Sequence, residues 1–162
     1  MQRDLKNISI IKRSKIISPA CSSRYVIPCV VDGLEAIIKS HKFKWGYRNE
    51  KAAYFKLKNE SFLPKLLYFD DKHLILCMTD VGDSVYNIKN INLKDYEKEL
   101  VNIIDKMSST YKLFHNDLRP KNICIDKNNN IKLSDFDRTC HKSIENKYIF
   151  RTNKWNFPSY YF

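Results

Sequence analysis

The sequence predicts an α+β domain built from antiparallel strands and a few helices. Three observations predict this fold class: alternating apolar segments joined by tight turns, two segments with the apolar spacing of helices, and a short hairpin that follows a polar loop. The 162 residues suffice for one compact domain or two small joined lobes. A hydrophobic content of 43% argues against a disordered chain.

The first hairpin is expected from strands over residues 24–31 and 34–40. Asp32-Gly33 between them favours a type I′ turn, in which both central residues take positive φ. Pro28 has no backbone donor, so we expect a bulge or interrupted pairing within the first strand.

Two helices are expected, over residues 45–58 and 93–107. Asn92 is placed to act as the N-cap of the second helix. The apolar positions that carry the helical spacing are Tyr47, Ala53, Tyr54 and Leu57 in the first helix and Leu93, Tyr96, Leu100, Ile104 and Met107 in the second. We expect these stripes to face the core.

A second hairpin is expected between the helices, over residues 66–69 and 73–78 around Asp70-Asp71. Residues 79–84 then break the apolar pattern, and Gly82 is the expected turning point of the chain.

The net charge of +11 and the pI near 9.4 predict attraction to polyanions, such as an acidic protein partner or nucleic acid. The lysines are spread along the chain, so a solvated basic surface is the favoured interpretation and nucleic acid is not required. No apolar run is long enough to span a bilayer, and no signal-peptide pattern is present. We expect an intracellular protein, cytoplasmic or nuclear, whose scattered cysteines are reduced and packed: Cys21, Cys29, Cys77, Cys124 and Cys140.

The polar loop at residues 115–122 carries the strongest chemical signal. Asp117 is followed five positions later by Asn122 and eighteen positions later by Asp135. Phosphoryl transfer from ATP needs such a set, because one carboxylate accepts the proton of the attacking hydroxyl while an amide and a second carboxylate hold Mg²⁺. A hairpin of strands 123–125 and 131–133 would return the chain, so that Asp135 faces Asn122. The alternative is a polar loop that only satisfies turn backbone.

This pattern, H-x-D-x-x-x-x-N followed by the variant D-F-D, resembles the protein kinase superfamily. The resemblance implies a bilobal fold with a small N-lobe sheet and one helix, a hinge, and a truncated helical C-lobe. It further implies that residues 1–162 form a single kinase-like domain. Its parts are an N-lobe at about 1–78, a hinge at about 79–84 and a C-lobe at about 85–162.

The resemblance also implies roles outside the polar loop. The segment 34–39 resembles the kinase strand written V-A-I-K, so Lys39 would bind the ATP phosphates and Glu50, eleven positions later, would orient it. Met78 would lie behind the adenine, and backbone groups near Asp80 and Val81 would bond the base edge. The implied cofactors are ATP and Mg²⁺.

The N-terminal region departs from the family pattern because it has no glycine-rich loop. The three glycines are Gly33, Gly46 and Gly82, and residues 18–23 occupy the place of that loop. Ser22 or Ser23 could donate hydroxyl groups to the phosphates instead, with weaker ATP binding as the expected consequence.

The C-terminal region departs in three ways. Asp137 replaces the glycine of D-F-G, and Asn116 replaces the arginine that pairs with an activation-loop phosphate, so control by that phosphorylation is expected to be absent. Arg119 is a cation suited to bridge to the γ-phosphate. Only 25 residues follow Asp137, and the aromatic segment 154–162 is expected to cap the shortened lobe.

The predicted function is phosphoryl transfer from Mg-ATP to a hydroxyl, foremost a serine or threonine of a protein, by a minimal, atypical kinase. Asp117 is the expected base, with His115 fixing the loop. The expected partners are a protein substrate or another kinase. One alternative is a catalytically weak or inactive mimic that binds and inhibits another kinase. A second is a small-molecule phosphotransferase resembling those that act on aminoglycosides or choline.

Overall fold

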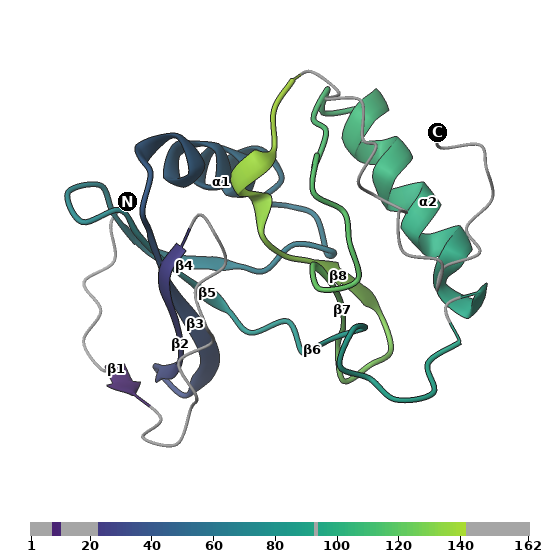
Figure 1. Ribbon diagram of the computed structural model, residues 1–162, viewed down its shortest axis with the longest axis horizontal. Helices are drawn as coiled ribbons and strands as arrows, with labels where there is room; N and C mark the ends of the chain where they lie inside the picture. The colour runs from purple at the N-terminus through teal and green to yellow at the C-terminus, as the bar shows by residue number, and fades with distance from the viewer. Residues whose placement is uncertain (1–7, 11–22, 93, 142–162) are drawn as a thin grey trace. The chain divides into compact units, whose positions relative to one another are not determined.

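The computed structural model describes residues 8–10, 23–92 and 94–141, and the chain divides into two compact units, residues 1–80 and 81–162 (Figure 1). In its described residues each unit combines an antiparallel sheet with one α-helix, which confirms the α+β class. The predictions for Cys21, Ser22 and the aromatic segment 154–162 lie outside the described residues.

The first unit is built on a five-stranded antiparallel sheet with the order β1-β2-β3-β5-β4. Its strands are β1 (Ile8–Ile10), β2 (Ser23–Val31), β3 (Leu34–His41), β4 (Leu66–Asp70) and β5 (Ile75–Thr79). Strand β3 lies in the middle, paired with both β2 and β5. No sequence signal predicted β1, which is three residues long and pairs with the end of β2.

The first hairpin has the predicted turn. Asp32 and Gly33 have φ of 49° and 79°, as a type I′ turn requires. The prediction of a bulge or interrupted pairing at Pro28 was wrong. Pro28 pairs in register with Ile37, and the irregularity of the strand lies between Ser23 and Tyr25. A proline removes one donor from the ladder, and here that loss does not shift the register.

The second hairpin has a longer turn than predicted, since β5 begins at Ile75 and not at residue 73. Asp70 Oδ1 accepts hydrogen bonds from the backbone N–H groups of Lys72 and His73, at 2.8 and 3.1 Å. These bonds draw both residues into the turn and leave Leu74 with a left-handed φ of 57°.

Helix α1 (Lys44–Lys56) packs on the sheet through β3 and β5 (Figure 1). Phe43 precedes it in an extended conformation and makes no side-chain cap hydrogen bond. The buried residues of the helix repeat every three or four positions and are Gly46, Tyr47, Glu50, Ala53 and Tyr54. The Tyr54 hydroxyl donates to Met78 Sδ at 2.9 Å and ties the helix to β5.

The core of the first unit contains two cysteines. Cys29 and Cys77 are buried with Val31 and Ala36, and no disulfide joins the cysteines among the described residues. Burial raises the pKa of the Cys77 thiol to about 12, so this thiol stays protonated at physiological pH. Both side chains serve as packing groups, as expected.

The second unit holds a three-stranded sheet of order β6-β7-β8 and helix α2 (Lys94–Ser109). The strands are β6 (Asp83–Ser84), β7 (Ile123–Ile125) and β8 (Ile131–Leu133), followed by the short 3₁₀-helix η1 (Phe136–Arg138). Asn92 Oδ1 accepts from the Lys94 N–H at 3.4 Å, in the region of the predicted cap. Glu99 of α2 accepts the Ile131 N–H at 3.2 Å and links the helix to β8. Neither described helix has the length and apolar character needed to cross a membrane.

Gly82 is required where it stands. Its φ is +91°, and a Cβ there would lie 2.4 Å from the backbone oxygen of Ile125. We expect Gly82→Ala to lower the free energy of unfolding by at least about 1–3 kcal/mol, because backbone strain and a clash with backbone add.

Thermal unfolding tests this prediction, and Gly33→Ala is the matched control. Gly33 has a similar φ of +79°, but a Cβ there would meet nothing within 4 Å. The Tm of Gly33→Ala should therefore fall less. Equal losses of Tm in the two variants would show that packing against Ile125 is not what requires Gly82.

Candidate active site

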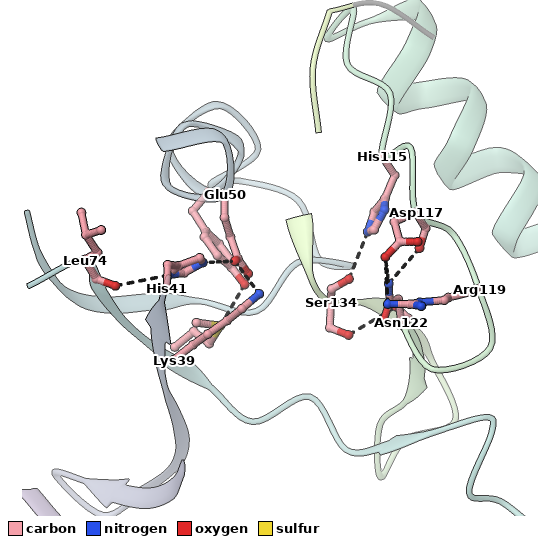
Figure 2. Close-up of polar contacts among 11 residues, drawn as sticks. Lys39, His41, Glu50, Leu74, His115, Asp117, Arg119, Asn122 and Ser134 are labelled. Atoms are coloured by element: carbon pink, nitrogen blue, oxygen red, sulfur yellow. Dashed lines mark hydrogen bonds and ion pairs between the residues drawn. The ribbon is translucent and has the colours of Figure 1, made fainter. Parts of the chain in front are cut away.

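A buried group of three charged or polar side chains lies between β3 and α1 in the first unit (Figure 2). Lys39 Nζ lies 2.6 Å from Glu50 Oε2, and His41 Nε2 lies 2.7 Å from the same oxygen. Glu50 and His41 are each 0% exposed, and Lys39 is 6% exposed. We call Lys39, His41 and Glu50 the buried triad.

The electrostatics of the buried triad favour an ionised Glu50. Burial by itself would raise the pKa of this carboxyl, but Lys39 and the hydrogen bond with His41 outweigh it and lower the pKa to about 2. The carboxylate therefore holds the Lys39 ammonium in a fixed place.

Residues predicted to surround the nucleotide base lie at the end of β5. Met78 is buried and accepts the hydrogen bond from Tyr54. The Asp80 N–H donates to the Glu35 backbone oxygen at 2.9 Å, so this donor is already used within the sheet and is not the one that would meet a base. Val81 is half-buried at the start of the second unit.

Ser23, which was predicted to donate its hydroxyl to the phosphates, begins β2. It is 1% exposed and pairs with His41.

The polar loop of the second unit is held together by Asn122 (Figure 2). Its side-chain N–H groups donate to the Asp117 backbone oxygen at 2.8 Å and to Asp117 Oδ2 at 3.1 Å. Arg119 Nη2 also lies 3.1 Å from Asp117 Oδ2. Both of these side-chain contacts use Oδ2, so within the described part of the chain Oδ1 is the oxygen of Asp117 that would accept a proton in base catalysis.

The polar loop is tied to the segment that ends the β7–β8 hairpin. The Ser134 N–H donates to the Asn122 backbone oxygen at 2.9 Å. His115 is buried, its Nε2–H donates to the Ser134 carbonyl at 3.0 Å, and its ring packs against Phe136 at 4.7 Å between centroids. Asp135 follows directly in a left-handed conformation, with φ 65° and ψ 61°. The hairpin thus returns Asp135 to the neighbourhood of Asn122.

The donor set near Asn122 fits a magnesium ion on chemical grounds. The Asn122 amide nitrogen is committed to Asp117, so its oxygen is the atom that a hard cation would take. Asp135 would supply a carboxylate beside it. No group of three or more His, Cys, Asp or Glu side chains in the described part of the chain could hold a metal by itself. Mg²⁺ bound to phosphates needs only one or two carboxylates from the protein.

Asn116, which stands where the family pattern has arginine, anchors the polar loop. Asn116 has a φ of 60°, which asparagine tolerates, and its Nδ2 donates to the Arg138 carbonyl at 3.3 Å and to Cys140 Sγ at 3.1 Å. Asp137 is 2% exposed within η1. In the family pattern this position is an arginine that pairs with an activation-loop phosphate. Here Asn116 instead holds the segment that follows Asp135.

His41 was not predicted from the sequence, although a signal exists. It lies two positions after Lys39 on a strand, so both side chains point to the same face of the sheet. The spacing of two residues between Lys39 and His41 therefore indicates that both can reach the same carboxylate of Glu50.

The comparisons with known proteins bear on the fold. No protein-family model and no curated protein matches the chain. Among the solved structures that match is the kinase PK-1 of the Cydia pomonella granulovirus, with a TM-score of 0.63 and 20% sequence identity over 82% of this chain. The protein has a protein-kinase-like fold. It spans 54% of the viral kinase chain, about half its length. At this identity the likeness concerns the fold alone.

Proposed function

We propose that this protein transfers the γ-phosphoryl group of Mg-ATP to a hydroxyl group, foremost a serine or threonine of a protein substrate. The observation that carries the proposal is the hydrogen bond from Asn122 to Asp117, together with the hydrogen bond from the Ser134 N–H to the Asn122 backbone oxygen, next to Asp135 in the chain. The proposed proton acceptor, Asp117, and the proposed magnesium ligands, Asn122 and Asp135, thus lie on the polar loop and on the hairpin end that is bonded to it. The protein-kinase-like fold supports the same reaction.

Each residue of the polar loop has a definite role in this proposal. Asp117 orients the acceptor hydroxyl and takes its proton on Oδ1. Arg119 lies against Oδ2 of the same carboxylate, where its charge would stabilise the negative charge that gathers on the transferring group. Asn122 and Asp135 would hold Mg²⁺, which neutralises phosphate charge when bound.

The first unit would supply the nucleotide contacts. Lys39 would bind the α- and β-phosphates, with Glu50 as the residue that orients it. In this proposal residues 1–78 act as the N-lobe, 79–84 as the hinge and 85–162 within the C-lobe of one kinase-like domain. Met78 would lie behind the base, with backbone groups of the hinge at the base edge.

We propose an acidic acceptor segment on charge grounds. Arg119 and Lys121 are exposed on the polar loop, and Lys121 lies over the exposed ring of Tyr86 at 4.8 Å. The whole chain carries a net charge of +11. Acidic residues beside the acceptor hydroxyl would find complementary charge there.

A second candidate function is a kinase mimic that binds another kinase without catalysis. One observation favours it: the place of the glycine-rich loop holds no glycine, and Ser23, one of the two hydroxyls expected to replace it, is 1% exposed. A mimic needs no nucleotide, and nucleotide binding is therefore the measurement that separates the two functions.

We expect Mg-ATP at about 100 times its Kd to raise the Tm of the wild type by about 5 °C or more, because a ligand that binds only the folded state stabilises it. Lys39→Ala should lose most of this rise, since the phosphates lose their cation. Lys42→Ala is the matched control, because Lys42 is exposed on the same stretch of chain and should keep the rise. No rise in the wild type would favour the mimic.

Radiolabelled transfer then identifies the acceptor. Mg-ATP labelled at the γ-phosphate would be offered to Ser/Thr peptides with acidic or basic flanks and to aminoglycosides and choline. The proposal predicts label on acidic peptides. Label on small molecules alone would assign the protein to small-molecule phosphotransfer.

A further inference from the structure

We propose that His41 is a positioning residue that acts as an imidazolium, through Glu50, on Lys39. This inference rests on the proposed function, in which Lys39 meets the phosphates. It is carried by the geometry of the buried triad (Figure 2).

Both ring nitrogens of His41 face oxygen acceptors. Nε2 lies 2.7 Å from Glu50 Oε2, and Nδ1 lies 3.3 Å from the Leu74 carbonyl oxygen. A neutral imidazole carries one N–H, so one nitrogen would turn a lone pair toward an oxygen. Only the imidazolium donates from both nitrogens.

The surroundings fix the ring in this place. The Leu74 carbonyl also accepts the His41 backbone N–H at 3.0 Å, and Leu74 takes a left-handed φ of 57° that a leucine rarely adopts. Tyr47 packs edge-on against the ring at 5.7 Å between centroids. His41 is 0% exposed. Among the residues that the structure describes, the charged and titratable groups that face it are Glu50 and Tyr47 from α1 and Lys39 from β3, while Ser23 beside it on β2 is uncharged.

The two cations compete for one oxygen. Lys39 Nζ and His41 Nε2 lie 2.6 and 2.7 Å from Glu50 Oε2, while Glu50 Oε1 is buried and has no hydrogen-bond partner among the described residues. If Lys39 were the sole cation, turning its ammonium toward a phosphate would leave a buried carboxylate uncompensated, which is costly. With His41 charged, Glu50 keeps a cationic donor while Lys39 is shared with the phosphates.

The consequence is a pH-dependent affinity for the nucleotide. A neutral imidazole at His41 would still donate one N–H to Glu50, but Lys39 would then be the sole positive charge beside this carboxylate, and its ammonium would be held more tightly. We expect the Kd of a non-hydrolysed Mg-ATP analogue to rise about tenfold between pH 6 and pH 9 in the wild type, relative to His41→Gln. The glutamine amide donates to Glu50 at every pH, so its own affinity should show no such dependence. Titration of the nucleotide itself is common to both proteins and cancels in the ratio.

The experiment is calorimetric titration with that analogue across this pH range, with His73→Gln as the matched control. His73 is an exposed histidine of the same unit, paired with Asp70, and its replacement should leave the wild-type profile unchanged. Parallel pH profiles for wild type and His41→Gln would overturn the proposal.

Nitrogen NMR of the wild-type histidines gives a second, independent test. His41 should show two protonated ring nitrogens at pH 7, and one protonated nitrogen at pH 6–7 would overturn the proposal even if His41→Gln fails to fold. Absence of nucleotide binding at every pH would reject the proposed function and the role of His41 toward phosphates. The NMR spectra would still decide whether His41 is the charged partner of Glu50.

Discussion

Asp117→Asn is expected to lower kcat by about 10²–10⁴-fold while leaving the Kd for Mg-ATP within about twofold of the wild type. Asparagine has the shape of aspartate and can still accept the hydrogen bond from Asn122, which is 3.1 Å from Oδ2. What it loses is the basicity needed to take the proton of the acceptor hydroxyl. The loss should therefore appear in the chemical step and not in nucleotide affinity.

Steady-state transfer to the best acceptor, together with calorimetric binding of the nucleotide, measures both quantities. Asp105→Asn is the matched control, because it makes the same chemical change at an exposed position of helix α2 in the same unit. An Asp117→Asn enzyme as fast as this control would remove Asp117 from the mechanism. A parallel loss of affinity and rate would instead show that the substitution had disturbed the metal ligands.

Glu50→Gln is expected to lower the free energy of unfolding by about 3–5 kcal/mol, because it leaves two cations in the interior without their anion. Lys39 and His41 both lie within 2.7 Å of the Glu50 carboxylate. Glutamine matches its volume, so the loss is electrostatic and not a cavity. The thermal stabilisation by Mg-ATP should also be lost, since nothing then fixes Lys39.

The pH dependence of this loss has a definite sign. The pKa of Glu50 is about 2 in the folded protein against an ordinary 4.5, so its ionised form stabilises the fold above pH 4.5 and this contribution disappears as pH falls toward 2. The difference in free energy of unfolding between wild type and Glu50→Gln should therefore shrink over that range.

Urea unfolding at a series of pH values measures this difference. Glu35→Gln is the control, since it makes the same chemical change at an exposed position of the same strand and should cost far less stability. A Glu50→Gln difference that stays constant down to pH 2 would mean that Glu50 is not the ionised centre of the buried triad.

Much of the fold was predictable because its signals are local. The type I′ turn at Asp32-Gly33 follows from two residues that accept positive φ, and helix α1 follows from apolar side chains every three or four positions. The β7–β8 hairpin appeared at its predicted residues, because alternating strands flank a turn rich in Asn and Asp. Strand β6 was missed, since two residues carry no pattern and pair only because β7 offers an edge.

The sequence alone determined the chemical types at the candidate site: Asp117, Asn122 and Asp135 stand at fixed spacing around a hairpin whose signals are local. Only the tertiary structure decided what these side chains touch. The meeting of His41 with Glu50 depends on the register of β3 and the rotation of α1, and the tether from Asn116 to Cys140 depends on how two distant segments pair. Such contacts join residues far apart in the chain, and local propensity carries no information about them.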